Sequence, residues 1–222
     1  ITIADLNTPN DIDSILVAAS NGRSERRQNT YNVNYRFANK KGQSFNVDLD
    51  YGSYKNESVR EQPNIYYNAT QDTILTEVVN RFDTPNDVFI YSAKMDYEQN
   101  LGKGKLSFGA KYTWVQPRNT FKDYDVNNEI ATLDSSVSNL FDYDENVYAG
   151  YVSLNYPLGK KWNASVGVRA EQTDATGELT PFLASLQEAP VELNYLNFFP
   201  SVGLSYQVSR MNSLNMNYGR RI

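Results

Sequence analysis

A strict alternation of apolar and polar side chains is the feature that most restricts what this chain can fold into. It is clearest between residues 106 and 114, where the apolar set is Leu106, Phe108, Ala110, Tyr112 and Trp114. The residues between them are Ser107, Gly109, Lys111 and Thr113. Side chains two residues apart point to the same side of a β-strand, so the segment has one apolar and one polar face. The apolar face meets either a protein core or lipid, and one strand alone is compatible with both.

The same alternation recurs in eight segments that form four hairpins. They cover residues 30–38 and 44–54, 87–99 and 105–116, 146–156 and 162–173, and 195–208 and 213–222. The turns inside the hairpins are short, whereas long connections join the hairpins over Lys55–Asn86, Pro117–Glu145 and Asp174–Asn194. This strict order places every long loop at one end of the sheet, as in outer-membrane barrels. It predicts an all-β fold, an antiparallel up-and-down meander of about eight long strands that is part of a larger transmembrane β-barrel.

The composition excludes several classes of function. The chain has neither Cys nor His, which removes disulfides, most zinc sites, the Ser-His-Asp triad and the commonest general base. Its net charge is -5 and no long basic run is present, so nucleic acid is not an expected partner. No apolar run approaches the ~20 residues that a membrane helix needs. The 17 tyrosines suit a pleated sheet and the aromatic girdles at membrane interfaces.

Three longer phrases resemble a known family. They are "NDVFIYSAKMDYEQNLGKGKLSFGAKYTWV", "FDYDENVYAGYVSLNYPLGKKWNASVGVRAEQT" and "NFFPSVGLSYQVSRMNSLNMNYGRRI". They are similar to the barrel of TonB-dependent outer-membrane receptors, in the Bacteroidetes-type outer-membrane β-barrel family. The likeness runs from about Asn29 to Ile222, and its most specific part is Phe198–Ser201 followed one hairpin later by Tyr218–Ile222.

This resemblance implies a bacterial outer-membrane location and a barrel of about twenty-two strands, closed by a plug domain on which TonB pulls. Such receptors import siderophores, glycans or peptides too large for porins. Eight strands cannot close that barrel, and no plug or TonB-binding sequence is present. Residues 1–28 are therefore expected to be a loop or a segment from a preceding strand, and residues 29–222 a fragment of the barrel domain. The chain also opens without Met or a signal segment, as an internal piece would.

Two groups of side chains are candidates for contacts inside or above the barrel. Charged residues on the faces expected to line the lumen are Lys94, Lys111, Arg169 and Glu171. They would pair within the barrel or against a plug, or would contact substrate. Aromatic residues in the expected extracellular loops would stack on a ligand or hold the loops together. They are Tyr66, Tyr67, Phe121, Tyr124 and Tyr143.

The segment from Asp123 to Asp134 has two interpretations. Asp123, Asp125, Asn127 and Asp134 approach the spacing of a calcium-binding loop, although Asn128 stands where that loop has its glycine. Alternatively the segment is a β-hairpin that turns at Asn127–Asn128 and pairs Tyr124 and Val126 with Ile130 and Thr132. The hairpin is the favoured prediction, and no other cofactor is expected.

Two further functions remain open from the sequence. One is a soluble or surface-exposed β domain that binds glycans. The other is an enzyme that uses two opposed carboxylates, but no pair of acids is brought together by the expected strands, so a non-enzymatic role is favoured. If the chain is a barrel fragment, its first and last strands, near Tyr31–Phe37 and Leu214–Tyr218, are expected to remain unpaired edges of an open, curved sheet.

Overall fold

The computed structural model describes residues 2–4 and 12–220, and most of them form one antiparallel sheet of twelve strands. The strands are β1 (Thr2–Ala4), β2 (Ile12–Ala18), β3 (Asn21–Ala38), β4 (Ser44–Asn68), β5 (Ile74–Asp83), β6 (Asn86–Leu101), β7 (Gly104–Asn127), β8 (Ile130–Leu133), β9 (Asn139–Leu158), β10 (Trp162–Pro181), β11 (Val191–Gln207) and β12 (Ser213–Gly219). A short 3-10 helix, η1 (Ala184–Leu186), lies between β10 and β11. None of the described helical residues forms a helix long and apolar enough to cross a membrane.

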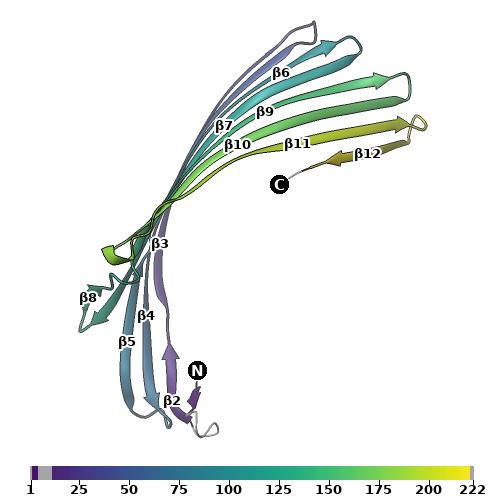
Figure 1. Cartoon of the computed structure of the whole chain (residues 1–222). Helices are drawn as coiled ribbons and strands as arrows, with labels where there is room; N and C mark the ends of the chain where they lie inside the picture. Colours follow the sequence, from purple (N-terminus) through teal and green to yellow (C-terminus); the bar gives the residue numbers. More distant parts are fainter. Residues whose placement is uncertain (1, 5–11, 221–222) are drawn as a thin grey trace.

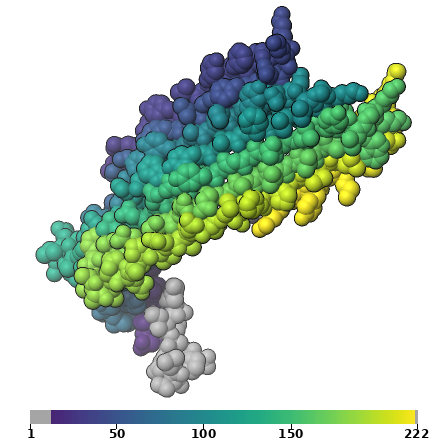
Figure 2. Space-filling model, turned by 45° about the horizontal axis from the view of Figure 1, so that its top comes forward, coloured from purple at the N-terminus to yellow at the C-terminus, as the bar shows by residue number. Residues whose placement is uncertain are grey.

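The eight predicted strands are β3, β4, β6, β7, β9, β10, β11 and β12, and they pair in that order as an up-and-down meander. Figure 1 shows them side by side, and Figure 2 shows the same progression from purple to yellow across the surface. The turns inside the four hairpins have two to five residues. Gly42, Gly102 and Gly159 adopt positive φ angles there, which side chains disfavour. The predicted fold class is confirmed.

The predicted long loops, in contrast, consist largely of strand. β4 continues to Asn68 and pairs with β5, β7 continues to Asn127, and β10 continues to Pro181 against β9. The predicted strand lengths were therefore too short, because β4 has 25 residues and β7 has 24. The strands continue well beyond the predicted ranges. This end of the sheet lies at the lower left of Figure 1 and is called the upper end below, because it is opposite the short turns.

Residues 12–28 are also more regular than expected. They form β2 and the first part of β3, and β2 pairs with the upper end of β4 from Ser14 opposite Asn68 to Ala18 opposite Asn64. β3 then pairs with β4 from Asn21 onwards. Residues 5–11, which were included in the same expectation, lie outside the described residues.

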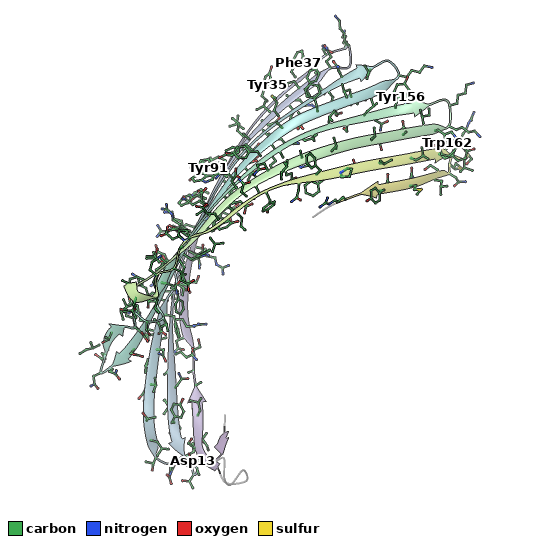
Figure 3. All side chains as sticks on the ribbon, viewed as in Figure 1. Asp13, Tyr35, Phe37, Tyr91, Tyr156 and Trp162 are labelled. Carbon is green, nitrogen blue, oxygen red and sulfur yellow. The ribbon has the colours of Figure 1, made fainter. Side chains whose placement is uncertain are left out.

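The pairing register divides the side chains between two faces. Phe108 lies opposite Val152 and Tyr112 opposite Tyr148, so these four residues share one face, as predicted. Figure 3 shows Tyr35 and Tyr91 on the convex side of the sheet. We call the convex face, which carries Phe108, Tyr112, Tyr148 and Val152, the outer face, and the opposite face the inner face. Lys111 lies opposite Lys94 and, on the other side, Ala149, on the inner face.

Two rows of aromatic side chains cross the outer face. The upper row is Tyr31, Tyr51, Tyr91 and Trp114, whose neighbouring ring centroids are 6.1, 4.8 and 5.1 Å apart. The lower row is Phe37, Phe45, Tyr97 and Phe108, which are directly opposite one another in the register. The rows are six residues apart on each strand, which corresponds to roughly 20 Å at ~3.3 Å per residue. Tyrosine, tryptophan and phenylalanine rows at such a spacing are typical of membrane-interface girdles.

At about the level of the upper row, the apolar residues change from the outer to the inner face. On β7 the apolar positions are even-numbered up to Trp114, and then odd-numbered at Val115, Pro117 and Phe121. Corresponding changes occur between Val147 and Tyr148 on β9 and between Tyr195 and Leu196 on β11. We call this change the phase switch. Above it the outer face carries acids and amides, including Asp142, which forms a salt bridge with Arg118 (Nε to Oδ1, 3.1 Å).

The phase switch explains why the sequence predicts loops where the structure has the upper parts of the strands. Their mean polarity resembles that of a loop, because their outer face is charged. On β9, β10 and β11 the alternation nevertheless continues, with the inner face apolar. The upper and lower parts of these strands therefore alternate with the same period of two residues. The apolar face is the inner face in the upper part and the outer face in the lower part.

The sheet has no second layer against it within the described residues. The apolar side chains that are buried there are only Ala149 and Ala175, whereas large residues such as Tyr31 and Val33 are each 64% exposed. A soluble sandwich of this size would bury its large apolar residues between two sheets. This arrangement argues against the soluble-domain alternative.

The sheet is open along both sides. Among the described residues β3 pairs only with β4, and β12 only with β11, so the first and last strands of the meander do not pair with each other. The prediction of an open, curved sheet is confirmed, and Figure 1 shows the two edges well separated.

Candidate functional site

The clearest candidate site is a groove on the inner face above the phase switch. Its floor is Ala175 and Gly177 on β10, and the larger side chains of the two neighbouring strands form its walls. Phe141 and Tyr143 on β9 form one wall, and Val191 and Leu193 on β11 form the other. The groove has a volume of about 240 Å³. It exists because small residues on a central strand lie between large residues on both sides.

The upper end of the groove is bounded by Leu179 and by the connection that follows η1. Glu188 and Ala189 line the groove there. The Gln187 side chain donates Nε2–H hydrogen bonds to the Leu179 and Glu188 carbonyl oxygens, both at 3.0 Å. These bonds hold the connection against the end of β10.

A carboxylate lies next to the aromatic wall. The Tyr143 hydroxyl donates a hydrogen bond to Glu145 Oε2 at 2.6 Å. This bond to a carboxylate, together with partial burial, raises the pKa of Tyr143 to about 12. Tyr143 is therefore a neutral donor at physiological pH. No salt bridge reaches Glu145 from the described residues.

The apolar wall continues sideways from the groove towards β4. In the row that contains Glu145, its register neighbours are Val115 and Ile90 on one side and Ala175 and Leu193 on the other. In the next row up, Val88 lies opposite Pro117. Glu145 is thus the one charged residue among these neighbours.

Below the phase switch the inner face is polar. Asn32 donates to Asp50 Oδ1 at 2.6 Å, and Asn34 donates to Asp48. Lys94 Nζ lies 2.7 Å from Asp96 Oδ2, and Arg169 pairs with Glu171. A polar hollow of about 510 Å³ lies among Arg36, Asp96 and their neighbours on this face. The lower inner face therefore suits water or a polar protein surface.

A family model described as the outer membrane protein beta-barrel family matches residues 36–222. The chain belongs to the outer membrane protein beta-barrel family. Its place is accordingly the bacterial outer membrane, and its outer face between the two aromatic rows meets lipid. In this family the short turns face the periplasm and the long ends of the strands face the exterior. The groove therefore lies on the inner wall at the extracellular end of the barrel.

A comparison with solved structures finds the ferric citrate transporter FecA in its unliganded form. The two folds have a TM-score of 0.48 and 12% sequence identity, over 87% of this chain and 36% of that chain. The barrel segment thus spans about a third of the length of that transporter. No curated protein matches the sequence.

The structure does not bring the candidate ligand-binding aromatic residues of this barrel segment together in one site. Tyr143 lines the groove, and Phe121 lies on the same face of the neighbouring strand β7, stacked on Phe82 with ring centroids 5.9 Å apart. Tyr124 lies on the outer face, where the Arg81 guanidinium is 5.9 Å from its ring centre. Tyr66 and Tyr67 lie near the tip of the β4–β5 hairpin, away from the other three.

The predicted lumen charges share the inner face of the barrel wall. The register places Lys94, Lys111, Arg169 and Glu171 there, below the phase switch. Arg169 also lies 5.8 Å from the centre of the Tyr151 ring. Two of the three bases thus have acidic partners on their own strands, and none of the four residues lines the groove.

The segment from Asp123 to Asp134 forms a hairpin at the extracellular end, as favoured from the sequence, but with a shifted turn. The turn residues are Asn128 and Glu129, with φ of 49° and 65°, so Asn127 pairs with Ile130, Tyr124 with Leu133 and Val126 with Ala131. The predicted turn was one residue too early, because Asn127 is extended. No group of three or more acidic side chains arranged to hold a metal ion is found among residues 2–4 and 12–220.

The groove residues on β10 and β11 were missed from the sequence. Ala175, Gly177, Val191 and Leu193 fall within a segment taken as a loop, between Asp174 and Asn194. Their signal is the odd-numbered series of small or apolar residues on both strands, set against polar even-numbered neighbours such as Thr176 and Glu192.

Proposed function

We propose that this barrel segment belongs to a TonB-dependent receptor that binds a nutrient too large for porins at its extracellular end and imports it. Part of the support comes from the likeness of Phe198–Ser201 and Tyr218–Ile222 to such receptors. The observation that carries the proposal is the apolar, aromatic inner wall above the phase switch. A water-filled porin has a polar lumen over its length. A wall that is apolar where the barrel opens to the medium suits a bound ligand.

The proposed mechanism is binding followed by gated passage, without covalent chemistry. Ligand contacts would come from the upper inner wall, with Tyr143 and Phe121 among them. The polar lower inner face, with Lys94, Lys111, Arg169 and Glu171, would contact a plug domain, and TonB would act on that plug. The plug would be another part of the complete receptor, and TonB would be a separate protein that binds to it.

A gene-deletion experiment tests the transport proposal. The wild-type bacterium and a strain lacking the complete receptor gene are grown in the same rich medium, and the compounds left in each medium are compared by mass spectrometry. We expect at least one compound to be removed by the wild type only, and its removal to stop when a protonophore dissipates the proton gradient. Identical depletion by the two strains would contradict the proposal.

A restored strain provides the control. The deletion strain carrying the intact gene should again deplete the compound, and a strain carrying the Phe121→Ala, Tyr143→Ala double variant should deplete it more slowly. Similar amounts of folded receptor in the outer membrane must be verified by heat-dependent gel mobility. If the double variant transports at the wild-type rate, the inner wall is not the binding surface.

A further inference from the structure

The groove along β10 has the shape of a slot for a flat ring. The Phe141 and Tyr143 rings are nearly parallel, with an interplanar angle of 19° and centroids 6.4 Å apart, so they present one continuous aromatic wall. Leu193 and Val191 face them across the small residues of the floor. Aromatic rings pack favourably against such walls. The volume of about 240 Å³ is below the ~300–1,000 Å³ of pockets for drug-sized ligands, so it suits one ring system.

The charge next to the slot is negative. Glu145 accepts one hydrogen bond, from Tyr143, and a carboxylate has room for several more. Glu188, in the connection after η1, lines the upper end. The inner-face bases are farther away. Arg169 is six residues from Ala175 on β10, roughly 20 Å along the strand, and is paired with Glu171.

Lys111 does not neutralise Glu145 either. It lies opposite Ala149, which is four residues from Glu145 on β9, or roughly 13 Å. The two side chains form no salt bridge. The groove is therefore an apolar slot beside a carboxylate that lacks a cationic partner in the described part of the chain.

We propose that the groove binds a ligand with a flat aromatic ring and a cationic nitrogen. The ring lies between the Phe141–Tyr143 wall and Leu193, and the nitrogen donates to the Glu145 carboxylate. Tyr143 holds that carboxylate in place through its hydroxyl. An anionic group on the same ring would meet Glu145 and Glu188 and be repelled. The inference rests on the proposed receptor function and names the substrate class of the same wall.

Matched probes with the same ring test the charge preference. Tryptamine carries an ammonium group and indole-3-acetate a carboxylate, on identical indole rings. Binding of each to the full-length receptor in lipid nanodiscs is measured by equilibrium dialysis. We expect saturable tryptamine binding at least about ten-fold tighter than that of indole-3-acetate, since a hydrogen bond between charged groups contributes at least that factor. Equal affinities, or no binding of tryptamine, would overturn the proposal.

Variants of the groove locate the binding. Glu145→Gln keeps the shape and should bring the tryptamine affinity close to that of indole-3-acetate. Gly177→Leu should abolish binding of both probes. A Cβ at Gly177 would make only ordinary contact with Phe141, at 3.6 Å, so the strand accepts a side chain that fills the slot. A tryptamine preference that survives Glu145→Gln, or binding that survives Gly177→Leu, contradicts the assignment.

The control is the residue next to Gly177 on the other face. Thr176→Leu introduces the same side chain on the outer face of β10 and should leave both affinities unchanged. If Gly177→Leu does not insert into the membrane, Leu193→Trp replaces it and fills the slot from the β11 wall. Insertion is checked for each variant by heat-dependent gel mobility.

The result is separable from that of the deletion experiment. If the deletion strain no longer takes up its nutrient but the probes show no charge preference, the transport function stands and the ligand class is wrong. If depletion is unchanged by deletion while tryptamine binds through Glu145, the groove is a binding site on a protein with another role.

Discussion

The Tyr151 side chain on β9 lies directly over the backbone of Gly109 on β7. A Cβ atom at Gly109 would be 2.5 Å from the Tyr151 hydroxyl oxygen and 2.5 Å from the Met95 carbonyl oxygen. We expect Gly109→Ala to destabilise the barrel by about 1–3 kcal/mol, because the tyrosine or the neighbouring backbone must move. Urea unfolding of the receptor in lipid vesicles measures this. Gly150→Ala is the control, since a Cβ there meets nothing within 4 Å and the stability should hardly change.

An added charge should cost more folding free energy on the outer face of β9 than on its inner face. Gly150→Arg places a cation on the lipid face between the two aromatic rows, near the middle of the membrane zone, and is expected to cost about 2–4 kcal/mol of folding free energy. Ser153→Arg, three residues further on, enters the polar hollow near Asp96 and Glu98 and should cost much less. Unfolding in vesicles compares the variants. Similar costs for both would mean that the outer face at this level does not meet lipid.

The β7–β8 turn carries removable backbone strain. Glu129 has a φ of 65°, a conformation that costs most residues roughly 1–2 kcal/mol and costs glycine little. Glu129→Gly should therefore increase the protection of the Asn127–Ile130 pair against hydrogen exchange by about ten-fold. Glu129→Ala removes the same charge but keeps the Cβ, so it should give no comparable gain. If both variants increase protection equally, the charge and not the backbone was responsible.

The base of the same hairpin should weaken as the pH rises. Burial raises the pKa of Asp123 above 3.8, and the nearby Asp125 and Asp134 carboxylates add to this; one of the Asp123 oxygens is buried without a hydrogen-bond partner. The neutral form is thus favoured in the folded hairpin. This contribution to stability is complete below about pH 3.8 and is lost as the pH rises through the folded-state pKa. Asp123→Asn should remove this loss and raise exchange protection of Val126 at pH 7.

Asp134 provides the opposite case. Hydrogen bonds from Ser136 lower its pKa, so its ionised form stabilises the folded hairpin above pH 3.8 and this support disappears in acid. Asp134→Asn should therefore lower protection at pH 7. If the two Asp→Asn variants shift protection in the same direction, the electrostatic account of the hairpin is wrong.

The meander and the lower faces were predictable from the sequence because alternation specifies faces locally. Phe108, Tyr112 and Lys111 needed only their positions in one strand to be assigned to a side. The order of short and long connections supplied the topology without any contact information.

The groove was not predictable in the same way, because it depends on three strands at once. Gly177 becomes a floor only when Tyr143 and Val191 are its register neighbours, and the two latter residues are separated by 48 positions in the chain. Tyr143 was singled out as an aromatic residue, but its wall and its carboxylate partner require the register. The turn at Asn128–Glu129 was missed for a local reason, since both Asn127 and Asn128 tolerate the left-handed conformation and Glu129 does so poorly.

The phase switch also removes an ambiguity of strand pairing. A regularly alternating strand that slides by two residues keeps every side chain on its own face, so alternation alone leaves the register undetermined in steps of two. Sliding β9 by two residues in one direction would draw Asn146 into the hydrocarbon, and sliding it by two in the other direction would lift Tyr148 to the level that Asn146 has now. The position of the switch in each strand therefore determines the depth at which that strand lies in the bilayer. Neighbouring strands that meet with the wrong offset would be at different depths, and the membrane itself would select against the mismatch.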